Sequence, residues 1–251
     1  MGDNASMYYT VKSGNRIRYE RFGGGNGVMI LHGLGGDLES MMPISREMKH
    51  DCTRILVDIP CHGGSDDFSI SLHDLGRELV SLMEANGFHR FYAIGVSLGS
   101  IIIEELMLDS PENILGAVLL SPASEIDSQV LNKVSSWVSS SERVSDDVFS
   151  REFREKHRKE IEAYDRSHPM DPGRLYNMVP NLLGFSVKGR LSHARVNMVV
   201  AEYDGIFGPR MNGDLKDAFP EATFTTLRSG HAIHREDPRA AAGIASDFFF
   251  A

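Results

Sequence analysis

Short apolar runs that alternate with helix-like segments constrain the fold of this chain most. Five largely apolar runs of four or five residues follow one another along the sequence, at 28–31, 55–59, 91–94, 117–120 and 196–200. Such runs are typical of strands that are buried on both faces of a parallel sheet. Apolar residues at helical spacing lie between or after them, at 72–83, 101–108 and 240–249. The alternation predicts right-handed βαβ units in a doubly wound α/β sheet.

Three further strands are expected at the two ends of the chain. Residues 8–12 and 16–22 flank Ser13-Gly14-Asn15, which predicts an antiparallel hairpin with a turn between its strands. A β-prone run at 222–227 predicts the last strand. The sheet is therefore expected to have eight strands, most of them parallel.

The alternation stops between residues 122 and 192, where three helix-like pieces, at 130–138, 148–164 and 175–183, occur without a strand run. We interpret this stretch as a small helical cap over the carboxyl edge of the sheet, where ligand sites of α/β proteins lie. The chain is then a single domain over 1–251, with a core at about 7–121 and 193–251. Apolar residues of the cap either pack on this core or line an apolar pocket. For the pocket we predict Trp137, Met178 and Leu182.

Composition excludes several classes of protein. The chain has 26 Lys plus Arg against 35 Asp plus Glu, a net charge of −9, whereas nucleic-acid binders need a basic surface. No window approaches the ~18 apolar residues of a membrane span, and because residues 1–6 are not followed by the apolar stretch of a signal peptide, we expect none. Cys52 and Cys61 lie at opposite ends of a predicted strand, too far apart for a disulfide. Free thiols suit a reducing compartment, so we expect a cytoplasmic protein.

A motif for a nucleophile lies between a predicted strand and a predicted helix. Gly95-Val-Ser-Leu-Gly99 fits G-x-S-x-G, follows the run at 91–94 and precedes a helix that begins near Leu98. This strand-turn-helix setting is that of a nucleophile elbow, in which small residues avoid clashes in a sharply strained backbone. Ser97 is therefore the candidate nucleophile.

Two more polar residues follow strands at the same edge of the predicted sheet. Asp204 lies in Ala201-Glu-Tyr-Asp-Gly205, after the run at 196–200, and His231 lies just past the last predicted strand. A serine hydroxyl is a weak nucleophile, so it needs a histidine base that an acid orients. Glu125, which follows the run at 117–120, is the alternative acid.

The loop after the run at 28–31 is rich in glycine, Leu31-His-Gly-Leu-Gly-Gly36. The backbone N–H groups of Leu34 and Leu98 are the candidates for an oxyanion hole. Among the remaining histidines, we expect His32 and His62 to orient loops and His234 to be structural.

From about residue 7 to residue 251 the sequence resembles the α/β-hydrolase fold family. The chain order Ser, Asp, His is that of the family. Asp58-Ile-Pro-Cys-His-Gly-Gly-Ser65 is similar to its D-x-P-G-H-G-x-S turn, and G-H-x-x-x-x-E-x-P is similar to its ending. Two residues depart from the pattern. Cys61 replaces the usual Gly, which predicts a different backbone path, and Val96 stands where relatives often have His.

The resemblance implies a serine hydrolase that cleaves a small carboxylic ester or related acyl compound through an acyl-enzyme, without a metal or organic cofactor. The same fold also includes aminopeptidase-like enzymes and carbon–carbon bond hydrolases. The loop His32-Gly-Leu-Gly-Gly36 differs from H-G-G-P-G of proline iminopeptidases, and Ala232 and Ile233 replace the Trp that often follows the histidine in carbon–carbon bond hydrolases. A ligand receptor that keeps the three residues but turns over slowly is a further alternative.

Overall fold

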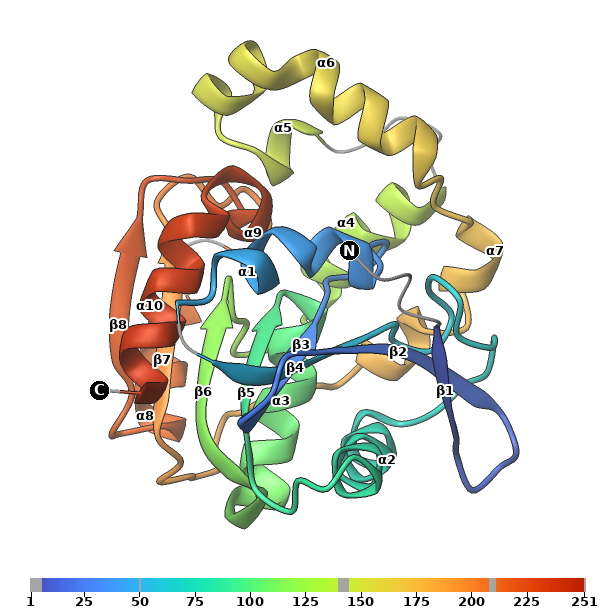
Figure 1. Cartoon of the computed structure of the whole chain (residues 1–251). Helices are drawn as coiled ribbons and strands as arrows, with labels where there is room; N and C mark the ends of the chain where they lie inside the picture. The colour runs from blue at the N-terminus through green and yellow to red at the C-terminus, as the bar shows by residue number, and fades with distance from the viewer. Residues whose placement is uncertain (1–5, 50, 140–144, 208–210, 251) are drawn as a thin grey trace.

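A single sheet organises the chain in the computed structural model, which describes residues 6–49, 51–139, 145–207 and 211–250 (Figure 1). For 136–139, 145, 146 and 212 it describes the backbone alone. Within these residues the sheet has eight strands in the order β1-β2-β4-β3-β5-β6-β7-β8. The strands are β1 (Met7–Thr10), β2 (Arg16–Phe22), β3 (Asn26–Leu31), β4 (Cys52–Val57), β5 (Phe91–Val96), β6 (Ile114–Leu120), β7 (Val196–Ala201) and β8 (Thr223–Leu227).

The strand pairing is mostly parallel, as the sequence predicts. β1 pairs with β2 and β2 with β4 in antiparallel register, and every other pair in the sheet is parallel. From β3 the chain first extends the sheet on one side with β4 and then crosses to the other side with β5. A reversal of this kind opens a crevice at the carboxyl ends of the two strands that flank it.

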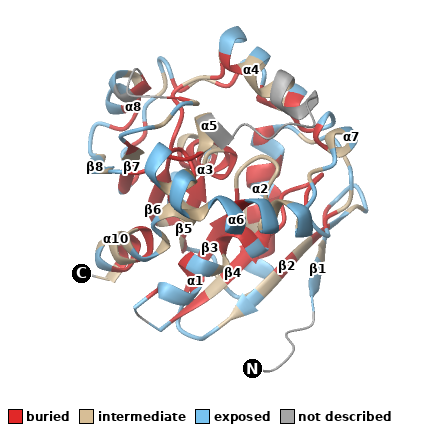
Figure 2. Ribbon diagram, turned by 90° about the horizontal axis from the view of Figure 1, so that it is seen from above, coloured by how far each residue is buried: buried red, intermediate tan, exposed pale blue. Residues whose placement is uncertain are grey.

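Two apolar cores, one on each face of the sheet, explain the continuous apolar runs. In β3, Met29 and Leu31 pack with α2 (Leu72–Ala85) and α3 (Leu98–Asp109), whereas Val28 and Ile30 pack with α1 (Met42–Glu47) and α10 (Pro238–Phe250). Successive side chains of a strand point to opposite faces, so a strand covered on both sides must be apolar throughout. Figure 2 shows the buried residues concentrated on β3, β4 and β5.

The predicted strand at 55–59 ends earlier than expected, at Val57. Asp58 instead begins a turn, because its carboxylate accepts the N–H groups of Leu38 and Gly64, each at 2.7 Å.

Short helices connect the strands and the larger helices. They are η1 (Leu38–Met41), η2 (Pro111–Asn113), α8 (Asn212–Ala218) and α9 (Ile233–Glu236).

Helices occupy the stretch between β6 and β7, above the edge toward which β5 and β6 point (Figure 1). We refer to residues 122–192 as the cap. The single helix expected over 148–164 is two helices, because α5 ends at Val148 and a new helix begins at Arg151, capped by the Ser150 hydroxyl. The cap elements are α4 (Ser128–Ser139), α5 (Ser145–Val148), α6 (Arg151–Ser167), α7 (Pro172–Leu175) and η3 (Val179–Leu182).

Both cysteines are buried with free thiols. Over the described ranges, no helix combines the length and the apolar character that crossing a bilayer requires.

Candidate active site

Ser97 occupies a strained turn between β5 and α3. Its φ of 52° and ψ of −111° lie outside the conformations that residues with a side chain favour. The turn is fixed by two hydrogen bonds: the Ser97 N–H donates to the Leu120 carbonyl at 2.9 Å, and the Ser100 hydroxyl donates to the Gly95 carbonyl at 2.9 Å. The strain is held by the surrounding sheet and helix, and the Ser97 side chain remains half-buried at their junction.

The two glycines of the turn allow α3 to begin against the sheet. A Cβ at Gly95 would lie 2.5 Å from the Gly99 carbonyl oxygen, and a Cβ at Gly99 would lie 2.5 Å from the Leu31 carbonyl oxygen. These separations are far below van der Waals contact, so no side chain fits at either position. The predicted reason for small residues at both ends of the motif is confirmed.

His231 and Asp204 form a hydrogen-bonded pair. His231 Nδ1 lies 2.8 Å from Asp204 Oδ2, and both side chains are largely buried. The other carboxylate oxygen, Oδ1, accepts the N–H groups of Ile206 at 2.8 Å and Phe207 at 3.0 Å. Because the carboxylate accepts the Nδ1 proton, the neutral imidazole leaves Nε2 as its acceptor nitrogen.

The surroundings of Asp204 keep it ionised. Burial raises the pKa of this carboxyl, but the attraction of His231 and the hydrogen bonds from His231, Phe207 and Ile206 outweigh burial, so the pKa lies below its ordinary value. The Phe207 ring also meets the His231 ring edge-on, with 5.1 Å between centroids. The imidazole is therefore fixed by a charge on one side and an aromatic ring on another.

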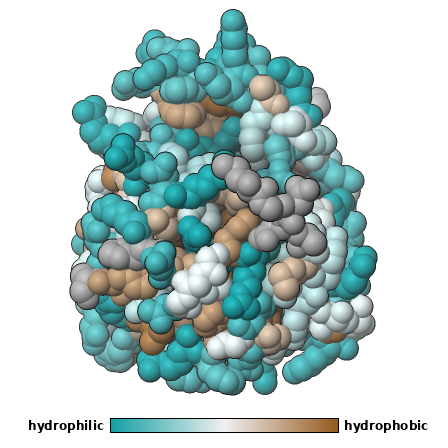
Figure 3. Space-filling model, viewed as in Figure 1, coloured by the Kyte–Doolittle hydropathy of each residue, from teal (hydrophilic) through white to brown (hydrophobic). Residues whose placement is uncertain are grey.

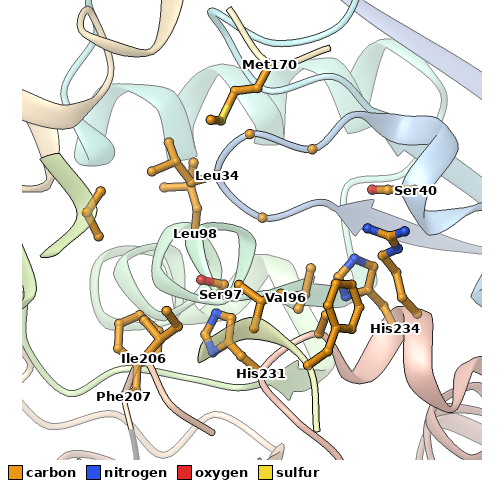
Figure 4. Close-up of a pocket in the computed structure, with 18 of the residues that line it drawn as sticks. Leu34, Ser40, Val96, Ser97, Leu98, Met170, Ile206, Phe207, His231 and His234 are labelled. Carbon is orange, nitrogen blue, oxygen red and sulfur yellow. The ribbon is translucent and has the colours of Figure 1, made fainter. Parts of the chain in front are cut away.

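Ser97 and His231 line one cavity of about 170 Å³ at the carboxyl edge of the sheet. Figure 4 shows the Ser97 side chain and the His231 imidazole next to each other, with Leu34 and Leu98 on the opposite side of the serine. In the side view of Figure 3, apolar side chains are visible in a hollow beneath the largely hydrophilic helices of the cap. The cavity thus joins a polar centre to mostly apolar walls.

The glycine-rich loop at 33–36 is held in place by two buried histidines. His62 Nε2 accepts the Gly35 N–H at 3.0 Å, and His32 Nε2 accepts the Ile59 N–H at 3.0 Å. Burial lowers the pKa of His62 to about 3 and that of His32 to about 4, so both rings stay neutral and keep these acceptor roles. The predicted role of both residues in orienting loops agrees with these contacts.

The N–H groups of Leu34 and Leu98 are available to a ligand. Neither donates a hydrogen bond to another of the residues that the structure covers, and Leu98 is the first residue of α3, where N–H groups have no partner inside the helix. Both residues line the cavity beside Ser97.

The rival acid Glu125 is engaged elsewhere. Its carboxylate lies 2.8 Å from Lys188 Nζ and it does not line the cavity. His234, predicted to be structural, does line the cavity, and burial lowers its pKa to about 3. Within the described part of the chain, no group of three or more His, Cys, Asp or Glu is placed to hold a metal ion.

The structure places the predicted pocket residues differently. Leu182 and Met178 are both buried in the main core, and of the two only Leu182 also lines the cavity. The Trp137 side chain lies outside the described residues. Residues that sequence reasoning missed include Phe149, Tyr164 and Met170 of the cap and Ile206 and Phe207 of the Asp204 loop. The one available signal was the pair of large apolar residues that follows Asp204-Gly205, since a loop rarely carries such a pair without a packing partner.

Cys61 occupies the turn in which relatives usually have Gly. Its φ is 70°, in the left-handed region that glycine adopts readily. The cysteine thus takes a backbone conformation that suits glycine. The Cys61 thiol donates to the Phe68 carbonyl at 3.4 Å, which helps to hold the turn.

Comparison with known sequences identifies the class of protein. The pattern of the alpha/beta hydrolase family matches residues 28–244, and the chain belongs to this family. The chain is also 30% identical over 124 residues to the dihydrolipoyllysine-residue acetyltransferase component of an acetoin cleaving system from Cupriavidus necator. That match covers 48% of this chain and 33% of the relative, so it spans about a third of the length of that protein.

A second relative is 2-succinyl-6-hydroxy-2,4-cyclohexadiene-1-carboxylate synthase from Salmonella heidelberg, 31% identical over 77 residues, which is 30% of each protein. Solved structures share the fold over the whole chain. A hydrolase from Pseudomonas aeruginosa has a TM-score of 0.86 at 18% identity and covers 100% of both chains. An enol-lactonase from Burkholderia xenovorans has a TM-score of 0.86 at 17% identity and covers 98% of this chain and 100% of its own.

Proposed function

We propose that the protein is a serine hydrolase that cleaves a small carboxylic ester or related acyl compound through an acyl-enzyme on Ser97. The observation that carries this proposal is the arrangement of three residues. Ser97 lies on a strained elbow, and His231 lines the same cavity while Asp204 holds its Nδ1 at 2.8 Å. In such an arrangement the histidine removes the serine proton during attack, and the acid orients the imidazole and stabilises its charged form.

The reaction follows from the free nitrogen of His231. Because Asp204 occupies Nδ1, Nε2 accepts the proton of the Ser97 hydroxyl as the oxygen attacks the acyl carbon. Nε2 then returns the proton to the leaving alcohol, and the acyl group remains on Ser97. Water attacks this ester in the second half, again through His231, and releases the carboxylic acid.

Charge that develops on the carbonyl oxygen needs donors that are already in place. We assign this role to the N–H groups of Leu34 and Leu98, which have no other acceptor among the described residues. Such preorganised donors are typically worth 10² to 10³ in kcat, or roughly 3–4 kcal/mol each. The fixed loop around Leu34 supports this assignment.

The cavity favours a small substrate with an apolar acyl part. Its volume of about 170 Å³ is close to that of an engineered cavity of roughly 150 Å³ that binds benzene. Most of the lining near Ser97 is apolar, including Ile101, Leu182 and Ile206. Solved relatives named an enol-lactonase and an esterase are consistent with acyl chemistry at this site.

The cell compartment and the partners are part of the same proposal. Two free buried cysteines suit the reducing cytoplasm, and a net charge of −9 favours a small-molecule substrate over nucleic acid.

Steady-state turnover of a panel of p-nitrophenyl esters, thioesters and amino-acid amides tests the proposal. We expect repeated turnover of at least one ester by the wild type and loss of that activity in Ser97→Ala. Turnover of amides alone would replace the proposal with an aminopeptidase-like reaction. A single acylation without further turnover would replace it with a ligand receptor.

A further inference from the structure

One short segment of the cap, residues 147–150, contacts the loops of both His231 and Asp204. We propose that this segment, together with Glu236, is a positioning clamp that holds the imidazole and the carboxylate in line with Ser97. The inference rests on the proposed function and deepens it, because it makes the cap part of the catalytic geometry.

The first half of the clamp is a carboxylate that joins the cap to the His231 loop. Glu236 Oε1 accepts the Ser150 N–H at 2.6 Å and the Gly230 N–H at 2.9 Å, and Glu236 Oε2 accepts the Ser150 hydroxyl at 2.7 Å. Hydrogen bonds to a carboxylate are stronger than neutral ones. Gly230 directly precedes His231, so this carboxylate fixes the backbone on one side of the imidazole.

The backbone on the other side of His231 is bonded to the same segment. The Ala232 N–H donates to the Val148 carbonyl at 3.0 Å, and Phe149 packs with Ala232 in one buried apolar cluster. The backbones of Gly230 and Ser150 are in close contact, because a Cβ at Gly230 would lie 2.5 Å from the Ser150 nitrogen. His231 is therefore flanked by cap contacts at the residue before it and the residue after it.

The second half of the clamp holds the Asp204 loop. The Gly205 N–H donates to the Asp147 carbonyl at 3.2 Å. Lys133 Nζ joins the same two residues, because it lies 2.7 Å from the Gly205 carbonyl oxygen and 2.9 Å from Asp147 Oδ2. Gly205 directly follows Asp204, so four consecutive cap residues hold both members of the hydrogen-bonded pair.

This arrangement matters because His231 must reach two partners at once. Its Nδ1 must stay on Asp204 while Nε2 stays within reach of Ser97, and a displacement of about 1 Å at a reacting group can cost on the order of 10² in rate. Glu236 itself does not line the cavity. Its loss should therefore lower kcat with little effect on KM.

The test uses Glu236→Ala, Glu236→Gln and Ser150→Ala, with Glu155→Gln and Ser167→Ala as matched controls. Glu155 and Ser167 lie on α6 in exposed positions, and among the described residues they bond only to neighbours within four positions in the sequence. We expect Glu236→Ala to lower kcat for the preferred ester by about 10²-fold, with KM changed less than about threefold. Glu236→Gln keeps one acceptor oxygen and should recover part of the loss. The controls should retain wild-type kcat.

A proton NMR signal separates positioning from mere stability and from failure of the proposed function. The far-downfield resonance of the His231 proton shared with Asp204 should shift or broaden in Glu236→Ala and Ser150→Ala, but not in the controls. This signal needs no substrate, so it tests the clamp even if no ester is turned over. An unchanged resonance, or a kcat loss that appears equally in the controls, would overturn the clamp. If Glu236→Ala does not fold, Glu236→Gln and Ser150→Ala give the same readout.

Discussion

Acid should destabilise the folded chain through histidines that the interior keeps neutral, and His62 is the clearest case. Burial, and next the neighbouring His32, lower the pKa of His62 to about 3, while Nε2 accepts the Gly35 N–H. In the unfolded chain a histidine titrates near ~6.5. The folded pKa is the lower one, so below pH ~6.5 the unfolded chain binds more protons. The stability that His62 contributes is thus complete above that pH and is lost as the pH falls toward about 3.

The size of the effect follows from the unfolded state. A pH of about 5 lies roughly 1.5 units below the pKa of a histidine in the unfolded chain, and each unit corresponds to about 1.4 kcal/mol. Folding therefore loses about 2 kcal/mol through His62 between about pH 7.5 and about pH 5. That is a large part of the 5–15 kcal/mol that is typical of the free energy of unfolding of a domain.

Urea unfolding of the wild type, His62→Asn and His89→Asn at the two pH values measures this share. The His89 side chain is 84% exposed and serves as the control. His62→Asn should be less stable at about pH 7.5, because the acceptor of the Gly35 N–H changes, yet its stability should depend less on pH. We expect the wild type and His89→Asn to lose about 2 kcal/mol more than His62→Asn on acidification. Equal losses in all three proteins would refute the reasoning.

Other predictions concern the site and its turn. Asp204→Asn should lower kcat by roughly 10³ to 10⁴ through the wrong tautomer, whereas Glu125→Gln should change it by less than about tenfold, both measured on proteins of wild-type melting temperature; the reverse ranking would make Glu125 the acid. Gly99→Ala should destabilise by about 3 kcal/mol or prevent folding, since its Cβ would lie 2.5 Å from the Leu31 carbonyl oxygen, while Gly213→Ala, in open space on α8, should be neutral or slightly stabilising in urea unfolding. Activity on p-nitrophenyl esters should rise from acetate toward butyrate, because the cavity walls are mainly apolar; a steady decline beyond acetate would contradict this.

The sheet could be predicted from the sequence because burial on both faces leaves a local signal. A central strand is largely apolar where both of its faces are covered, as at 28–31 in β3, so a run of four apolar residues is sufficient to locate it. The positions of Ser97, Asp204 and His231 were predictable for a related reason. Each residue lies within four residues of the carboxyl end of a strand, and parallel strands bring their carboxyl ends to one edge.

The cap could be predicted as helices but not as walls of a cavity. Met178 and Leu182 have the same character, lie four residues apart and both pack in the main core, yet only Leu182 also lines the cavity. The direction of each side chain depends on contacts with distant elements, which a local pattern does not contain. The helix break at Phe149–Ser150 has the same origin, because there the backbone bonds to Ala232 and Glu236, more than eighty residues away.

Covalent labelling tests the central claim, that Ser97 is the residue that becomes acylated, most directly. The wild type is treated with a serine-directed fluorophosphonate, and its intact mass and labelled peptide are measured beside those of Ser97→Ala and of Ser167→Ala, an exposed serine on α6. We expect one adduct per chain, located on Ser97, present in Ser167→Ala and absent from Ser97→Ala. An adduct on any other residue, or one that persists in Ser97→Ala, would contradict it.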